Sequence, residues 1–364
     1  MSSTYGEAVK ISIFGQSHSE AIGVVIDGLP YGEEIDLDTV QTFMGRRAPG
    51  QSQYTTSRKE GDVPRIVSGI YEGKTTGAPL CAVIENTNTK SKDYDQLKDI
   101  PRPGHADFTA EVKYKGFQDH RGGGHFSGRL TAPLCFAGAV CKQILERKNI
   151  YIGGHIDSIH TIQDESFPPV NLKKEDFQKV LLHDFPTIDE AVGEKMKERI
   201  LKAKTDHDSV GGVVECGVIG LPVGVGEPMF DGLESKLSSI VFGIPAVKGV
   251  TFGDGFEVST KYGSENNDSF FMGADNKVET KTNHHGGSLG GISSGMPLLM
   301  KVAFKPTPSI AKEQQSVSLK EGKDTPLGIV GRHDPCIVGR ALPCVEAAVA
   351  VALLDLYTIY QSRI

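Results

Sequence analysis

An α+β fold without a doubly wound sheet is what the sequence predicts, because strand-like and helix-like segments alternate with no regular strand–helix–strand rhythm. Residues 10–14 alternate apolar and polar side chains, as expected of a strand with one buried face. Residues 36–47 instead place apolar side chains on one face of a helix. The most apolar segment, residues 345–360, lies in a final predicted helix over 342–361, which we expect to be buried.

The remaining elements follow from the same periodicities. A helix is predicted to begin between Ser127 and Thr131 and to end near Arg147. Pro133 must either lie in its first turn, where a missing N–H is tolerated, or kink it. Residues 88–126 show almost no periodicity and are expected to form a long loop, and residues 260–285 to form a mobile surface loop. Further strands are expected at 24–26, 81–84, 213–219 and 299–304, and further helices at 172–183, 186–204 and 232–243.

Composition limits the class of protein. The 364 residues, 38% hydrophobic and 23% charged, are compatible with one large domain or two. We expect one large domain over residues 1–364, with room for two internally similar halves. Glycine is in excess, at 43 residues, and concentrates in short runs such as 122–124 rather than in a fibrous repeat. Such runs let the backbone turn sharply or approach a ligand closely.

Charge, cysteine and the N-terminal residues argue against several kinds of partner. A net charge of −7 excludes a general nucleic-acid surface, so any anion site must be local. The six cysteines include no Cys-x-x-Cys pair and are interpreted as buried, reduced thiols rather than disulfides or metal ligands. No secretory leader is apparent, and Glu346 and Asp355 interrupt the most apolar segment, so we expect a cytoplasmic enzyme without a membrane span.

Two short motifs place a histidine beside turn-forming or polar residues. Gly15-Gln16-Ser17-His18 follows the first strand, and a Ser-His pair on such a loop can bind or protonate an oxyanion. In Arg102-Pro103-Gly104-His105-Ala106-Asp107 a histidine lies between a cation and a carboxylate, which suits proton transfer near neutral pH. A turn with an exposed histidine, and a capped turn, are the structural alternatives.

A glycine-rich segment, Arg121 to Arg129, leads into the helix that ends near Arg147. Glycine-rich backbone before a helix N-terminus offers unpaired N–H groups to an anion, and the two arginines add charge-assisted hydrogen bonds. The segment lacks the Lys-Ser/Thr ending of a P-loop. A flexible glycine hinge is the alternative, but it leaves the flanking arginines unexplained.

Two further motifs lie in the C-terminal third. Lys305-Pro306-Thr307-Pro308-Ser309 offers a lysine and hydroxyls on a stiff backbone, which suits phosphate, although a surface strand end would look the same. Arg332-His333-Asp334-Pro335-Cys336 packs three charge types together, and Pro335 restricts the backbone of Asp334. A polar turn before the last helix is its alternative. Two other polar groups, Asp206-His207-Asp208 and His284-His285, lack partners at metal-ligand spacing, so no metal site is expected.

Taken together, these motifs resemble the chorismate synthase family in order and spacing from about residue 10 to residue 355. The chain departs from the usual family residues at Gln16, Gln53, His125, Phe126, Pro133 and Cys135. The matching segments are residues 15–18, 23–30, 46–47, 91–94, 102–107, 124–131, 245–249, 286–292, 332–336 and 346–347.

The resemblance implies a β-α-β sandwich with helices packed between antiparallel sheets, and members are usually homotetramers. It implies a lyase that eliminates phosphate from 5-enolpyruvylshikimate 3-phosphate in a 1,4-anti sense to give chorismate, the last step of the shikimate pathway toward aromatic amino acids. Reduced FMN is required although the reaction is redox-neutral overall, so the expected partners are the small substrate and a flavin reductase or another source of reduced FMN. Some members reduce the flavin themselves with NADPH.

The resemblance also assigns roles to residues of this chain. His18 protonates the departing phosphate, His105 stabilises the reduced flavin, and Asp334 acts near flavin N5 in a proton relay. Arg47 is additionally an NADP contact. The implied substrate contacts are Ser17, Arg46, Arg47, Arg102, Arg121 and Arg129, and the implied flavin contacts are His125, Phe126, Ser127, Pro245, Ala246, Gly290, Lys305, Pro306, Thr307, Pro308, Ser309 and Arg332.

Two other functions remain open at this level. One is a different phosphate-eliminating lyase on the same scaffold, which activity without flavin would indicate. The other is a non-catalytic module that binds phosphorylated ligands or RNA, which a steep salt dependence of RNA affinity would indicate. The acidic net charge, and the histidines among the arginines, argue against the second.

Overall fold

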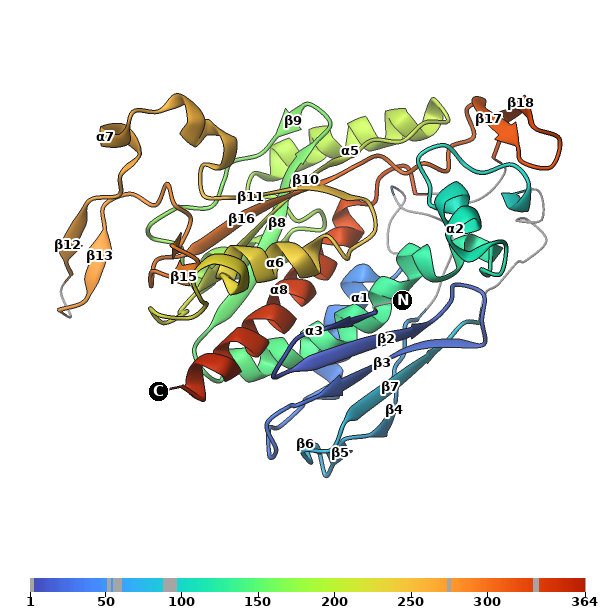
Figure 1. Ribbon diagram of the computed structural model, residues 1–364. Helices are drawn as coiled ribbons and strands as arrows, with labels where there is room; N and C mark the ends of the chain where they lie inside the picture. Colours follow the sequence, from blue (N-terminus) through green and yellow to red (C-terminus); the bar gives the residue numbers. More distant parts are fainter. Residues whose placement is uncertain are drawn as a thin grey trace.

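A layer of helices lies between two five-stranded antiparallel sheets (Figure 1). This arrangement confirms the predicted α+β class and the sandwich of helices between sheets. The computed structural model describes residues 3–50, 54, 61–87, 97–273, 276–329 and 334–363. The main apolar core joins residues from both sheets and from the helices between them.

The first sheet has the order β1-β2-β3-β7-β4. Its central strand carries four buried residues within its seven, because one face packs on the helical layer. The strands at 10–14, 24–26 and 81–84 are thereby confirmed. The bounds are β1 Thr4–Tyr5, β2 Lys10–Gly15, β3 Ala21–Asp27, β4 Arg65–Ser68 and β7 Leu80–Glu85, beside the small ribbon β5 Ile70–Tyr71 and β6 Lys74–Thr75.

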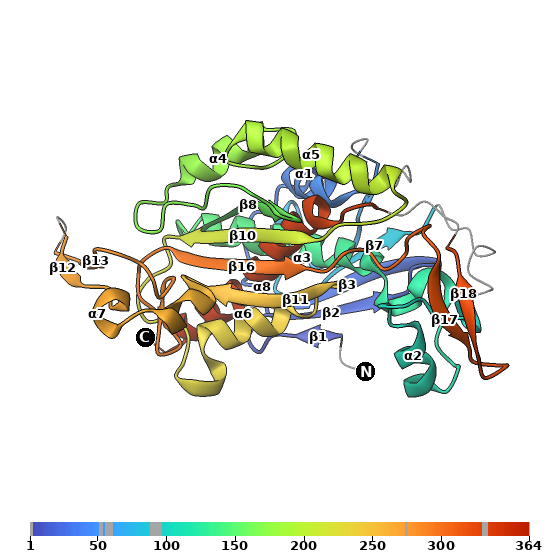
Figure 2. The ribbon, with the colours of Figure 1, turned by 90° about the horizontal axis from the view of Figure 1, so that it is seen from above.

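The second sheet has the order β11-β16-β10-β8-β9. Helices α4 (Lys174–Leu182) and α5 (Glu190–Thr205) pack on its β8 and β9 side (Figure 2). Since α8 covers its other face, β8 is buried along nearly its whole length. The bounds are β8 Tyr151–Ile159, β9 Ile162–Gln163, β10 Gly212–Ile219, β11 Val247–Phe252 and β16 Leu298–Phe304.

Four helices form the middle layer: α1 (Leu37–Arg47), α3 (Thr131–Glu146), α6 (Leu233–Val241) and α8 (Val338–Gln361). Asp36 caps α1 by accepting hydrogen bonds from two backbone N–H groups, and Pro133 lies in the first turn of α3, one of the two predicted alternatives. The axes of α3 and α8 approach so closely that a Cβ at Gly138 would lie 2.2 Å from the Cα of Ala347. By length and composition α8 could cross a bilayer, but 83% of its most apolar window is buried in the protein, as in a core helix.

The two sheets share one pattern of connections. In the first sheet the strands β2 and β3 are followed by helix α1, by the edge strand β4, and then by β7, which pairs between β3 and β4. In the second sheet the strands β8 and β10 are followed by helix α6, by the edge strand β11, and then by β16, which pairs between β10 and β11. A long helix, α3 or α8, closes each pattern. This correspondence supports the proposal of two internally similar halves within one large domain.

Three sequence expectations need correction. The segment 88–126, as far as it is described, is not a plain loop, because it contains α2 (Asp107–Tyr114), too short to show a clear periodicity. The 260–285 segment forms α7 (Gly263–Asn266) and a protruding hairpin of β12 (Phe270–Met272) and β13 (Val278–Thr280). The last helix begins at Val338 rather than 342, with Pro343 inside it.

Two further ribbons are β14 (Ser288–Leu289) with β15 (Ile292–Ser293) and β17 (Gln314–Ser318) with β18 (Lys323–Leu327).

Candidate active site

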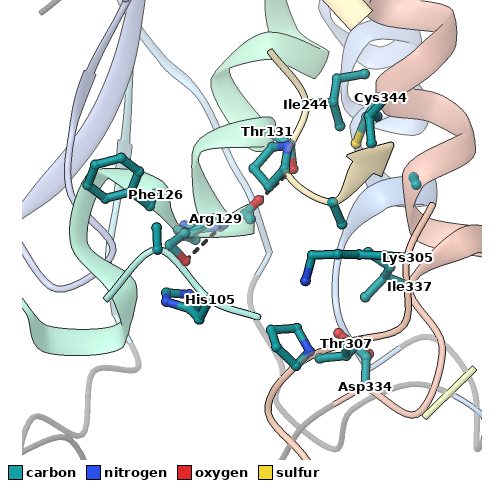
Figure 3. Close-up of a pocket in the computed structure, with 18 of the residues that line it drawn as sticks. His105, Phe126, Arg129, Thr131, Ile244, Lys305, Thr307, Asp334, Ile337 and Cys344 are labelled. Carbon is teal, nitrogen blue, oxygen red and sulfur yellow. Dashed lines mark hydrogen bonds between the residues drawn. The ribbon is translucent and has the colours of Figure 1, made fainter. Parts of the chain in front are cut away.

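A pocket of about 630 Å³ lies where α3 and α8 begin (Figure 3). Its walls come from segments that are far apart in the sequence, namely residues 102–106, 122–131, 242–248, 305–309 and 334–344, with Ser17 and Arg47. A volume of this size is typical of sites for small molecules and cofactors. The topology therefore brings most of the sequence motifs to one place.

Three buried charged residues form what we call the pocket cluster: Arg47, Asp62 and Arg129. Arg47 Nη1 lies 2.5 Å from Asp62 Oδ2, and Arg129 Nη1 donates to Asp62 Oδ1. Burial alone would raise the pKa of Asp62, but the two guanidinium groups lower it below its ordinary value. The carboxylate is therefore ionised, and the cluster keeps one more cation than carboxylate. Both arginines line the pocket.

The motif at 102–107 folds on the carboxylate of Asp107. Arg102 donates from Nε at 2.7 Å and from Nη2 at 2.8 Å, and His105 Nδ1 lies 2.6 Å away. Although burial opposes it, these hydrogen bonds lower the pKa of Asp107 well below its usual range. The carboxylate fixes the imidazole by Nδ1, which leaves Nε2 as its second polar atom. Both Arg102 and His105 line the pocket.

The glycine run packs against the two predicted catalytic histidines. Gly122, Gly123 and Gly124 have φ values of 60°, 88° and 54°, a region that favours glycine. A Cβ at Gly122 would lie 2.3 Å from the ring of His18, and one at Gly123 would lie 3.0 Å from the ring of His105. The glycines are therefore required for the close approach of this loop to both imidazoles, rather than for a flexible hinge.

Ser17 and His18 lie on the loop between β2 and β3. The Ser17 Oγ is 3.1 Å from His18 Nδ1, and the Ser17 backbone N–H donates to the Gly124 carbonyl at 3.1 Å. Both side chains are buried. Ser17 lines the pocket, whereas His18 is not among its lining residues.

The opposite wall carries further cations. Lys305 donates to the Gly104 carbonyl at 2.9 Å, and burial together with the charge of Lys248 lowers the pKa of Lys305. Arg340, in the first turn of α8, pairs with Asp334 and donates from Nε to the Arg47 carbonyl at 3.0 Å. The buried hydroxyl of Thr307 makes no hydrogen bond within the described residues. These groups suit an anionic ligand.

Nearly the whole chain is similar to proteins of one known family. The chorismate synthase family model matches residues 9–358. The chorismate synthase of Methanocaldococcus jannaschii is 44% identical over 361 residues, covering 97% of this chain and 95% of that protein. That of Lancefieldella parvula is 44% identical over 372 residues, covering 99% and 97%. The chain belongs to the chorismate synthase family.

A solved structure supports the fold. A crystal structure of chorismate synthase superposes with a TM-score of 0.77, at 24% identity, over 98% of this chain and 93% of that one. Membership in the chorismate synthase family makes the chain a lyase of aromatic biosynthesis. The predicted family resemblance and enzyme class are thereby confirmed.

Most residues expected for chorismate synthase chemistry lie on the pocket wall, but several do not. Arg46 makes a two-pronged ion pair with the buried Glu346, Arg121 pairs with Asp119, and Gly290 lies in the turn between β14 and β15. Arg332 lies outside the described residues, as do Gln53, His333 and the segment 91–94. Arg46, Arg121 and Gly290 do not line the pocket, and neither do His18 and Pro306. The lining does include Ser17, Arg47, Arg102, His105, His125, Phe126, Ser127, Arg129, Pro245, Ala246, Lys305, Thr307, Pro308, Ser309 and Asp334.

Some functional residues of the pocket were missed from sequence. Asp62 has no motif around it, and its importance follows only from the two arginines that reach it. Lys248 was visible within the matched segment 245–249, whereas Arg340 lies before residue 342, where the last helix was predicted to begin. Within the described residues, no group of three or more His, Cys, Asp or Glu side chains could hold a metal. His284 pairs with Asp254, and His285 with Asp268.

Proposed function

We propose that this enzyme eliminates phosphate from 5-enolpyruvylshikimate 3-phosphate in a 1,4-anti sense to give chorismate, the last step of the shikimate pathway, and requires reduced FMN. The observation that carries the proposal is the pocket itself. It brings Arg47, Arg102, Arg129 and Arg340 to the same cavity as His105 in an otherwise acidic chain. A substrate with two carboxylates and a phosphate needs such a local excess of cations.

The pocket residues also suit FMN. Phe126, Ile244 and Ile337 give an apolar wall for a planar ring system. Lys305 and the Thr307 hydroxyl, which has no hydrogen-bond partner among the described residues, suit a phosphate or a polar atom of the ring. We propose that these residues, with His125, Ser127, Pro245, Ala246, Pro308 and Ser309, hold the cofactor. When bound, reduced FMN supplies the transient electron donation that lets phosphate leave. Arg332 and Gly290 remain predicted contacts.

The proposed proton transfers use residues of this chain. His18 donates from Nδ1 through the Ser17 hydroxyl, 3.1 Å away, to the departing phosphate, since Ser17 faces the cavity. Asp334 accepts a proton on its carboxylate, and its partner Arg340 keeps that carboxylate oriented. His105, fixed by Asp107, stabilises negative charge on the cofactor through Nε2.

An anaerobic assay tests the reaction. Photoreduced FMN and 5-enolpyruvylshikimate 3-phosphate are added to the protein, and phosphate release is followed. We expect turnover that depends on reduced FMN. His105→Asn should lower turnover about 100-fold or more, as for loss of a positioned charge-stabilising group. His160→Asn is a matched control, because His160 is exposed and its φ of 55° suits asparagine.

Each other outcome of that assay is informative. Phosphate release without flavin would indicate a different lyase on this scaffold, and no release with reduced FMN would contradict the proposal. Replacing photoreduction by NADPH and oxidised FMN asks whether the protein reduces its own flavin. Arg47, a predicted NADP contact, would then be tested by Arg47→Lys. Without such activity a separate flavin reductase, or another source of reduced FMN, is the expected partner.

We further propose a cytoplasmic homotetramer. The arm formed by α7, β12 and β13 protrudes from the body (Figure 1) and exposes Tyr262, Phe270 and Met272 at 77%, 64% and 62%. An exposed apolar patch of this kind is typical of an interaction surface. Light scattering on the purified protein gives the oligomeric state directly, and a monomeric mass would contradict this part of the proposal.

A further inference from the structure

Two cysteines from different helices meet beside the pocket. Cys135 lies on α3 and Cys344 on α8, and their sulfur atoms are 3.8 Å apart. The helices are in close contact here, with Gly138 against Ala347 one turn further along each. A disulfide requires an S–S distance of about 2.0 Å, so the two sulfurs must come closer by about 1.8 Å to form one. Among the described residues, no other pair of cysteine sulfurs forms a hydrogen bond.

The two thiols differ in environment. Cys344 lines the pocket, and the hydrogen bond from Cys135, together with Arg47 and Arg340, lowers the pKa of Cys344 below its ordinary value against the effect of burial. Burial raises the pKa of Cys135 well above its ordinary value. Burial likewise raises the pKa of Cys336, to about 12. Cys344 is therefore suited to react first, since the thiolate is the reactive form and the pocket gives a small reagent access to it.

We propose that Cys135 and Cys344 form a peroxide-sensitive dithiol site, in which oxidation joins α3 to α8 at the pocket wall. The Cys344 thiolate attacks one oxygen of hydrogen peroxide, so an S–O bond forms, the O–O bond breaks and hydroxide leaves. The Cys135 thiol then attacks the resulting sulfenic acid, so the S–S bond forms and the oxygen leaves as water with the thiol proton. The two sulfurs lose two electrons in total, and the peroxide is reduced to two waters. This site does not depend on the proposed reaction.

Thiol counting on the whole protein tests the site. The reduced, folded protein is treated with graded hydrogen peroxide, and free thiols are counted after denaturation. We expect the count to fall from six to four, with recovery by dithiothreitol and a linked peptide pair containing Cys135 and Cys344. A count that stays at six until the protein is unfolded would overturn the proposal, and so would a linked peptide containing any other cysteine.

Three variants assign the roles. Cys344→Val should abolish the loss of thiols, and Cys135→Val should leave Cys344 as a sulfenic acid that dimedone traps. Valine is close to cysteine in size, and circular dichroism checks that each variant folds. Cys81→Ser is the matched control, because Cys81 is more exposed than the other cysteines yet should not affect the reaction. Dimedone labelling elsewhere than at Cys344 would contradict the assignment of the first nucleophile.

Discussion

Two clusters of buried charge in this enzyme have different surroundings and different consequences. The pocket cluster, Arg47–Asp62–Arg129, has more cations than carboxylates, and both arginines face a cavity. A second cluster, which we call the sheet cluster, lies on β8, β10, β16 and the residues after β9. It consists of His155, Asp157, Asp164, Glu215 and Lys301.

The sheet cluster is closed rather than open. His155 and Lys301 are the cross-strand neighbours of Glu215, and the Phe167 ring packs edge-on against the imidazole at 4.6 Å. Its carboxylates also accept backbone hydrogen bonds from Phe167 and Ile188, which fasten the 164–188 segment to the sheet. None of its members lines the pocket. Buried charge thus faces a cavity in one cluster and fastens a segment to the sheet in the other.

The largest effect is expected from breaking the pocket cluster. Asp62→Ala leaves two buried guanidinium groups without their shared carboxylate, which should cost about 3–5 kcal/mol of the free energy of unfolding. Phosphate release should also fall, because both arginines lose their fixed orientation. Urea unfolding and the anaerobic assay measure the two effects.

Glu198→Ala is the matched control for this prediction, since Glu198 is an exposed carboxylate on α5. It should change the unfolding free energy by less than about 0.5 kcal/mol. If Asp62→Ala unfolded at the same urea concentration as this control, the cluster would not have the structural importance assigned to it.

The sheet cluster should make stability depend on pH near neutrality. Burial alone would lower the pKa of His155, but the carboxylates of Asp164 and Glu215 raise it to about 8. Glu215 lies 2.8 Å from Nε2, whereas Asp164 lies 3.4 Å from Nδ1 in an ion pair that lacks hydrogen-bond geometry. Because the folded pKa exceeds the unfolded value of about 6.5, this stabilisation of about 2 kcal/mol is complete below pH 6.5 and is lost as pH rises through 8.

Urea unfolding at intervals from pH 6 to pH 9 measures that dependence. His155→Gln should be less stable at pH 6 and should show a much smaller decrease between pH 7 and pH 9. An equal decrease in the variant would mean that another group titrates. Phosphate release per folded molecule should be unchanged in His155→Gln, which separates this cluster from the pocket cluster.

Much of this architecture could be predicted from the sequence, because it depends on local pattern. The strand at 10–14 and the helix at 36–47 follow from periodicity, and the structure has them. The short helix α2 could not be found, because eight residues give too few turns to show a period. The start of α8 before Pro343 depends on tertiary packing, since 17 of its residues are buried.

Prediction of the site had a different limit. The motifs identified His105, Arg102 and the glycine run, but the close approach expected of the glycines was to a ligand. Which groups approach could not be known, since the contacts of Gly122 and Gly123 are with imidazoles on other segments. In the structure Arg46, Arg47, Arg102, Arg121 and Arg129 each pair with a carboxylate. A counter-ion distant in sequence, such as Asp62, carries no local signal.

The smallest effect is expected at the solvent-facing rim of the sheet cluster. Lys301 Nζ lies 2.6 Å from Asp157 and 4.0 Å from Glu215, but its side chain is 28% exposed. Lys301→Met keeps the aliphatic stem and removes the positive charge. Water can then solvate part of the carboxylate charge of Asp157 and Glu215 that the lysine no longer pairs. We expect a loss of about 1 kcal/mol or less in the free energy of unfolding, smaller still at high salt. A loss as large as that of Asp62→Ala, unaffected by salt, would mean that water reaches the charges around Lys301 no better than those of the pocket cluster. The two clusters would then differ only in how deeply their charges are buried.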